Sequence, residues 1–266
     1  MKRIIRNVYI YVMLLFLYAP IIVLMVYSFN ASKSRGTWDG FTLAWYRQLI
    51  TNSEIQSALY YTIAIAVLAT IISTIAGIIS SIGIYLYNAK VQKLLLNINY
   101  LPVINPDIVT GVSMMILFAA FSIRHGFLTM LIAHITFCIP YVILSILPKL
   151  RQMNIYLVEA AMDLGAKPWH TIKKVILPQI KPGIITGILF AFTLSIDDFV
   201  ISFFTTGSGV SNLSIYVYSM AKRGISPEIN ALSTIMIVVV TFLLFIINKR
   251  GNKKTKIKGE ITGERI

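Results

Sequence analysis

The sequence predicts an all-α integral membrane protein with six transmembrane helices and a helical cytoplasmic segment between the fourth and the fifth. Hydrophobic residues make up 57% of the 266 residues and charged residues only 13%, a balance typical of membrane proteins rather than of soluble domains. Apolar runs of about 20 residues, the length that crosses a bilayer as a helix, recur along the chain. Basic residues gather between these runs, which indicates a fixed orientation in the membrane.

Six apolar runs are the expected spans. They are residues 8–29, 58–87, 100–123, 127–147, 183–204 and 231–247. The first follows Lys2, Arg3 and Arg6, but it is too long for a signal peptide and lacks a small-residue cleavage site, so we expect an uncleaved span. Pro102 and Pro106 interrupt the third run. A broken helix at this depth is tolerated where protein or a water-filled cavity satisfies the freed backbone groups.

The distribution of Lys and Arg predicts the orientation. One side, made of the N-terminus, the loop with Lys90 and Lys93, residues 149–181 and the tail, holds 18 of them, and the other side holds 6. The positive-inside rule therefore predicts both termini in the cytoplasm of a multi-pass inner-membrane protein. This also accounts for the net charge of +14 without nucleic acid as a partner. The tail, residues 249–266, is polar and basic, as in a solvated or lipid-surface extension.

Small residues recur every four positions in two of the spans. Ser73, Gly77 and Ser81 form one such row, and Gly183 and Gly187 form a GxxxG pair. Small residues let helix backbones approach closely in membranes, so we expect packed helices rather than isolated anchors.

The segment 149–181 is too polar to span the membrane and too patterned for a plain loop. Asn154 is expected to cap a first helix, and Gly165 to permit the left-handed turn that ends it. Pro168 suits the first position of a second helix, which Pro178 and Pro182 are expected to end. The pattern predicts helix, tight turn and helix at the cytoplasmic surface.

This segment resembles the EAA loop of binding-protein-dependent ABC importer permeases, which docks in a groove of the ATPase subunit. The matching residues are Glu159, Ala160, Ala161, Gly165, Leu177 and Pro178. The resemblance implies a coupling helix that transmits a domain motion as a rigid-body shift. The alternative is an amphipathic helix lying on anionic lipid, which Lys167, Lys173 and Lys174 would favour.

No motif in the sequence predicts a cofactor site in this chain. No Gly is followed by Lys, so the phosphate-binding loop of ATPases is missing, and ATP and Mg²⁺ are expected on a partner ATP-binding subunit, in two copies. A lone cysteine, Cys138, offers neither a disulfide framework nor a metal site. His134 and His125 have no evident nucleophile at useful spacing, so we expect a bonded structural role for them and not an enzyme.

Acidic residues inside expected spans are candidates for a substrate pathway. They are Asp107 in the third span and Asp197 and Asp198 in the fifth. Carboxylates near Phe199 and Phe203 would suit an organic cation through ion pairing and cation–π contact. The alternative is that the aspartates bond backbone groups at a helix break, or pair with a basic residue of a partner subunit.

Three stretches, residues 106–111, 192–199 and 215–235, are similar to the permease subunits of spermidine/putrescine importers. This resemblance implies a complex with a sister permease, the ATP-binding subunits and a polyamine-binding protein outside the membrane. It also implies a cavity wall that includes Phe192, Ser195, Asp197 and Asp198, with Asp107 as a further candidate. The alternatives are a related importer for another small solute and, from a different class, a passive channel.

Overall fold

The computed structural model describes all residues except 1, 33–36, 224–226, 239–240 and 242–266. The described residues are nearly all helical, and their β pairing is a single isolated bridge between Asn30 and Phe41. The all-α expectation is therefore confirmed for this part of the chain. The expected tail, residues 249–266, and most of the second half of the expected last span lie outside the described residues.

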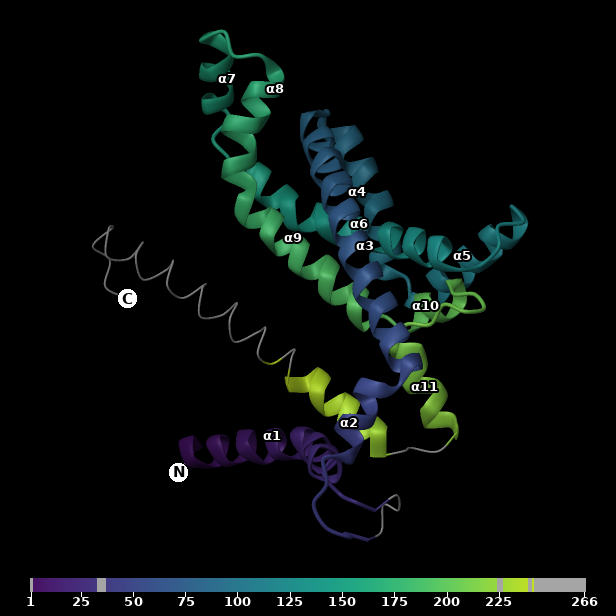
Figure 1. Cartoon of the computed structure of the whole chain (residues 1–266). Helices are drawn as coiled ribbons and strands as arrows, with labels where there is room; N and C mark the ends of the chain where they lie inside the picture. The colour runs from purple at the N-terminus through teal and green to yellow at the C-terminus, as the bar shows by residue number, and fades with distance from the viewer. Residues whose placement is uncertain (1, 33–36, 224–226, 239–240, 242–266) are drawn as a thin grey trace. The chain divides into compact units, whose positions relative to one another are not determined.

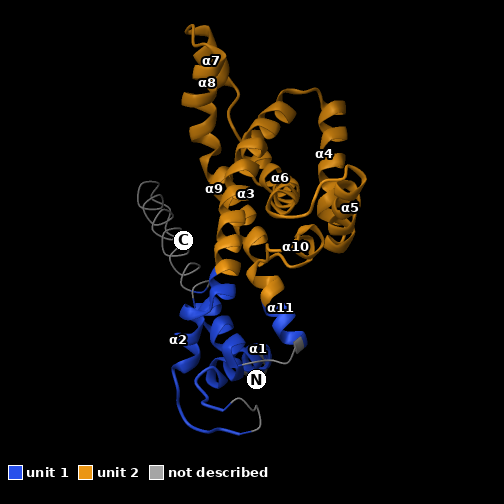
Figure 2. Cartoon of the chain, turned by 45° about the vertical axis from the view of Figure 1, so that its right-hand side comes forward, with its two compact units in different colours: residues 1–56, 217–266 blue, residues 57–216 orange. Residues whose placement is uncertain are grey.

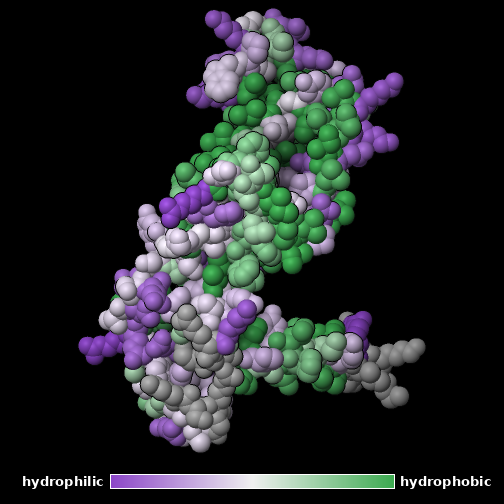
Figure 3. Space-filling view, turned by 90° about the vertical axis from the view of Figure 1, so that its right-hand side faces the viewer, coloured by the Kyte–Doolittle hydropathy of each residue, from purple (hydrophilic) through white to green (hydrophobic). Residues whose placement is uncertain are grey.

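Among the described residues, four helices are long and apolar enough to cross a membrane (Figure 1). They are α1 (Lys2–Tyr27), counted from Arg6, α3 (Ser53–Leu86), α6 (Phe127–Arg151) and the continuous stretch Pro168–Asp197. A shorter apolar helix, Pro227–Val238, covers the start of the expected last span. Hydrophobic side chains cover much of the upper half of the face seen in Figure 3, and hydrophilic ones lie at the end with α7 and α8 and again lower on the molecule. The chain is therefore a multi-pass membrane protein with at least four candidate spans.

The chain divides into two compact units, residues 1–56 with 217–266 and residues 57–216 (Figure 2). In the first unit, α1 has no buried residue in its most apolar window, so this helix presents apolar side chains all round. The loop that follows α1 is anchored on α2 (Ala44–Thr51), because Trp45 Nε1 donates to the carbonyl of Asn30 at 2.7 Å. Phe29 stacks on Phe41, with ring centroids 5.4 Å apart.

The third expected span is broken into two helices. These are α4 (Ala89–Ile104) and α5 (Asp107–Ala120), whose axes differ by 101° across the break at Asn105 and Pro106. The interruption expected at Pro106 is confirmed, but the one expected at Pro102 is wrong, because Pro102 lies inside α4. The pair also begins eleven residues before residue 100. Lys90 and Lys93, expected in a loop, lie on α4, because the Asn88 side chain accepts from Val91 N and starts the helix there.

The second helix of segment 149–181 does not end at Pro178 or Pro182, so that expectation is wrong. α8 (Pro168–Thr171) continues through a π-turn, η1 (Ile172–Ile176), into α9 (Leu177–Asp197). Proline lacks an N–H, and its ring clashes with the carbonyl four residues earlier in an α-helix. Here that carbonyl belongs to Lys174, inside the π-turn, whose wider spacing accommodates the ring without breaking the helix.

α6 and α9 pack along each other at the centre of the second unit. A Cβ atom added at Gly183 would lie 2.8 Å from the carbonyl oxygen of Ser145, and one at Gly187 would lie 3.2 Å from Val142 Cγ1. Gly77 of α3 also approaches Val142, and a Cβ atom added there would lie 2.5 Å from Val142 Cγ1. The close approach expected at the small-residue rows is confirmed, and it permits the buried cluster of Cys138, Val142, Ile146, Leu150 and Ile180.

Replacing Gly183 with alanine is expected to destabilise the packed pair by about 1–3 kcal/mol, the range for overpacking a tight contact. The nearest obstacle is backbone, which cannot rotate away. Gly83→Ala is the matched control, because an added Cβ there meets nothing within 4 Å. The measurement is the thermal unfolding midpoint of the solubilised protein. Equal midpoints for both variants would contradict the contact.

Candidate functional site

The fifth expected span breaks at the aspartate pair. α9 ends at Asp197, Asp198 is extended with φ −68° and ψ 127°, and α10 runs over Val200–Thr205. The N–H groups of Ile201 and Ser202 donate to the Asp198 carboxylate at 3.2 and 2.7 Å. These are donors of the first turn of α10, which no helical carbonyl satisfies. Asp198 therefore bonds backbone groups at a helix break. This is one of the alternatives that the sequence left open for the aspartates.

A buried polar cluster holds this break in place, and we name its five members the histidine cluster. They are His134, Ser195, Asp198, Ser202 and Asn212. His134 comes from α6 and is 1% exposed. Its Nδ1 lies 2.7 Å from Ser195 Oγ before the break, and its Nε2 lies 2.9 Å from Ser202 Oγ after it. Because one ring contacts both sides, α6 fixes the angle between α9 and α10.

Asn212 ties the chain after α10 to the same cluster. Its Nδ2 donates to Ser202 Oγ at 2.8 Å and to the carbonyl of Asp198 at 3.0 Å. Its Oδ1 accepts from Ile215 N at 2.9 Å, at the start of α11 (Leu213–Arg223). The Nε2 of His134 also lies 3.4 Å from Asp198 Oδ2. The bonded structural role expected of His134 is confirmed. His125 Nε2, by contrast, is buried without a hydrogen-bond partner among the described residues. Ser202 and Asn212 were not predicted, because their partners are set only by the fold.

The five pathway candidates separate into enclosed and open side chains. Ser195 and Asp198 are enclosed in the histidine cluster, and Phe192 is half-buried. Asp197 and Asp107 are exposed, one as the last residue of α9 and the other as the first of α5. Within the described part of the chain, Asp197 has no hydrogen-bond or ion-pair partner. The two adjacent carboxylates thus face different surroundings.

The helices that follow the two breaks meet, because α5 packs against α10. A Cβ atom added at Gly111 of α5 would lie 3.0 Å from Phe204 Cδ2 and 3.4 Å from Ile201 Cα. An added Cβ would therefore make a tight contact, which the Phe204 ring would have to relieve by a small shift. Each helix break has one exposed carboxylate beside it, Asp107 at one and Asp197 at the other.

The second candidate region is the hairpin of α7 (Tyr156–Asp163) and α8. Asn154 Oδ1 accepts from Tyr156 N at 3.0 Å, but the N-cap of α7 is Ile155 and makes no side-chain cap bond, so the expected cap lies one residue too early. The hairpin turns at Gly165, whose φ is +82°. Gly165 N donates to the carbonyl of Met162 at 2.9 Å and Ala166 N to that of Ala161 at 3.0 Å. This bonding is a Schellman motif, in which glycine supplies the left-handed residue.

The surface of this hairpin combines apolar and acidic side chains. Leu164 is 89% exposed and Trp169 is 72% exposed. Glu159 and Ala160 are also exposed, Ala161 is half-buried, and α7 has no buried residue. Leu177 is half-buried and Pro178 exposed at the start of α9. Exposed apolar side chains with adjacent charges are typical of a protein-binding surface.

The chain is similar in sequence to known membrane transport proteins. Residues 73–256 match the family described as the binding-protein-dependent transport system inner membrane component. The chain is 35% identical over 257 residues to the spermidine/putrescine transport system permease protein PotC of Shigella flexneri, covering 97% of each. It is 38% identical over 238 residues to the putrescine transport system permease protein PotI of Escherichia coli K12, covering 87% of this chain and 85% of that one.

Among solved structures, a chain of a bacterial ABC transporter for the import of alginate matches with a TM-score of 0.69. The identity is 18%, and the match covers 95% of this chain and 98% of the other. This likeness supports the fold of an ABC importer permease. With a family model that spans most of the sequence and relatives matched over nearly their whole length, the chain belongs to the binding-protein-dependent transport system inner membrane component family.

Proposed function

We propose that this chain is a permease subunit of an ATP-driven importer of spermidine and putrescine, which a binding protein delivers from outside the membrane. The observation that carries the proposal is the identity of 35–38% to polyamine permeases over most of the chain. A sister permease completes the pathway, and an ATP-binding subunit, in two copies, supplies hydrolysis. This chain binds no ATP or Mg²⁺ itself.

The proposed topology has six spans with both termini in the cytoplasm. α4 with α5 forms one broken span and α9 with α10 another, and the last span begins in the helix Pro227–Val238. The hairpin of α7 and α8 then lies on the cytoplasmic side, where its turn and exposed Leu164 and Trp169 favour docking on the ATPase. Glu159, Ala160 and Ala161 are the proposed contact residues, positioned by Gly165 and by the Leu177–Pro178 start of α9.

The proposed cargo path runs past the two helix breaks. Asp197 and Asp107 are exposed carboxylates, and a polyamine carries several ammonium groups, so ion pairing would hold the cation as it passes. Phe192 adds an aromatic wall. Asp198 and Ser195, also candidates for the pathway, position the break from within the histidine cluster.

The experiment is uptake of labelled spermidine and putrescine by cells that lack their own polyamine importers. These cells would express the chain with its genomic ATP-binding subunit, sister permease and binding protein. We expect ATP-dependent uptake that disappears when this chain is omitted. An assembled complex that hydrolyses ATP but takes up neither polyamine would overturn the cargo assignment and leave an importer for another small solute.

A further inference from the structure

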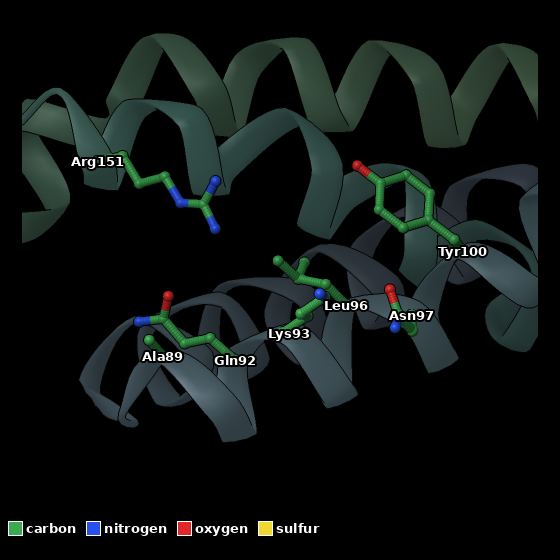
Figure 4. A pocket seen from close by; sticks show the side chains of 7 residues that line it. All are labelled: Ala89, Gln92, Lys93, Leu96, Asn97, Tyr100 and Arg151. Atoms are coloured by element: carbon green, nitrogen blue, oxygen red, sulfur yellow. The ribbon is translucent and has the colours of Figure 1, made fainter.

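A cavity of about 250 Å³ lies between α4 and the end of α6, away from the histidine cluster. Figure 4 shows Arg151 of α6 on one side and Gln92, Lys93 and Leu96 of α4 on the other. The remaining lining residues are Ala89, Asn97 and Tyr100. We name this cavity the α4–α6 pocket.

The lining of the α4–α6 pocket is rich in hydrogen-bond donors and lacks acidic side chains. Lys93 and Arg151 are both exposed, and neither forms an ion pair with a carboxylate of the described residues. Asn97 and Tyr100 add an amide and a phenol. Gln92 Nε2 donates to the carbonyls of Tyr85 and Tyr87, both at 3.0 Å, which fixes that side chain on the pocket wall. Two cations without an acidic partner are suited to an anion with several oxygens.

The flanks of the pocket point to a lipid as the source of this anion. Leu94, Ile98 and Leu101 of α4 are more than half exposed, and α4 has no buried residue. In a membrane these side chains contact acyl chains, while Lys93 reaches the headgroup level. Arg151 ends α6 just before the α7–α8 hairpin, so the pocket opens at the same end of α6 as that hairpin. Basic pockets between helices on the cytoplasmic side are suited to anionic headgroups.

We propose that the α4–α6 pocket binds the phosphodiester headgroup of an anionic lipid such as phosphatidylglycerol. Arg151 and Lys93 hold the phosphate oxygens from opposite walls, and Tyr100 and Asn97 hydrogen-bond the glycerol. Bound lipid joins α4 to the end of α6 and so supports the base of the hairpin. This proposal rests on the proposed topology, which places the pocket on the cytoplasmic side of the membrane. It does not depend on which cargo the importer carries.

The test is titration of the purified importer complex with phosphatidylglycerol, with bound lipid counted by native mass spectrometry. Each basic side chain contributes a factor of about five to binding an anionic headgroup. Lys93→Gln with Arg151→Gln is therefore expected to weaken phosphatidylglycerol binding about 25-fold. Phosphatidylcholine binding should not change. Because lipid is counted without transport, this result is independent of polyamine uptake.

Two sets of variants make the test specific. Arg6→Gln with Lys90→Gln removes the same charge outside the pocket and should retain wild-type affinity. Lys93→Arg with Arg151→Lys keeps both charges and should restore most of the binding, which separates the site from a folding defect. Equal affinity in the Gln pair and the control pair would overturn the proposal. So would saturable binding of inorganic phosphate, dependent on Lys93 and Arg151, in a complex that does not retain phosphatidylglycerol.

Discussion

Gly165→Val is expected to reduce polyamine uptake at least tenfold, through loss of the ATP-binding subunit from the complex. The backbone at Gly165 has φ +82°, where an L-residue costs about 1–2 kcal/mol and a β-branched residue more. No atom outside the neighbouring backbone lies within 4 Å of the position of an added Cβ. The surroundings therefore do not hold the turn, and the valine variant is expected to relax into another conformation.

A relaxed turn lowers the fraction of molecules that present α7 in its docking geometry. Apparent affinity falls in proportion to that fraction, so a cost of about 1.4 kcal/mol corresponds to a tenfold weaker complex. The measurement is retention of the ATP-binding subunit when the tagged chain is purified, together with uptake.

Asparagine is the control at the same position, because its side chain tolerates the left-handed region. Gly165→Asn is expected to retain most of the ATP-binding subunit. Gly209→Val introduces the same kind of strain at φ +87° in another loop and should not release the subunit. If the valine variant keeps both the ATP-binding subunit and uptake, the hairpin is not the coupling element.

Features that depend on nearby residues could be predicted from the sequence. The Gly165 turn follows from a glycine after an amphipathic helix, and its Schellman bonds stay within six residues. The close approach at Gly183 follows from small residues at a spacing of four, although the sequence did not identify Ser145 as the neighbour. Apolar length likewise predicted α1, α3 and α6.

Features that depend on distant partners could not be predicted. The break after Asp197 needs His134, 61 residues before Ser195, and Asn212, which lies in a loop. Hydropathy alone gives one continuous span there, because Phe199 to Phe204 are as apolar as the helix before them. Continuation through Pro178 depends on the π-turn, for which no sequence pattern was available. Local rules therefore located the aspartate pair but not the different environments of its two members.

The different environments of Asp197 and Asp198 predict different effects on stability when each is replaced by the isosteric asparagine. Asp198→Asn replaces one carboxylate oxygen with an NH₂ group that faces the backbone donors of Ile201 or Ser202. Hydrogen bonds to a charged group contribute about 1.5–3 kcal/mol, so we expect a loss of that size in stability. The break would loosen, and both the unfolding midpoint and the yield of assembled complex would fall.

Asp197→Asn is expected to leave stability within about 0.5 kcal/mol of wild type, because the side chain is exposed and makes no bond within the described residues. It removes the negative charge that we propose meets the cargo, so uptake should fall about tenfold, the equivalent of 1.4 kcal/mol of ion pairing. Uptake and the unfolding midpoint, measured on both variants in parallel, separate the two roles. Asp197→Asn with normal uptake would remove Asp197 from the pathway, whereas a midpoint lowered as far as in Asp198→Asn would make Asp197 a structural residue.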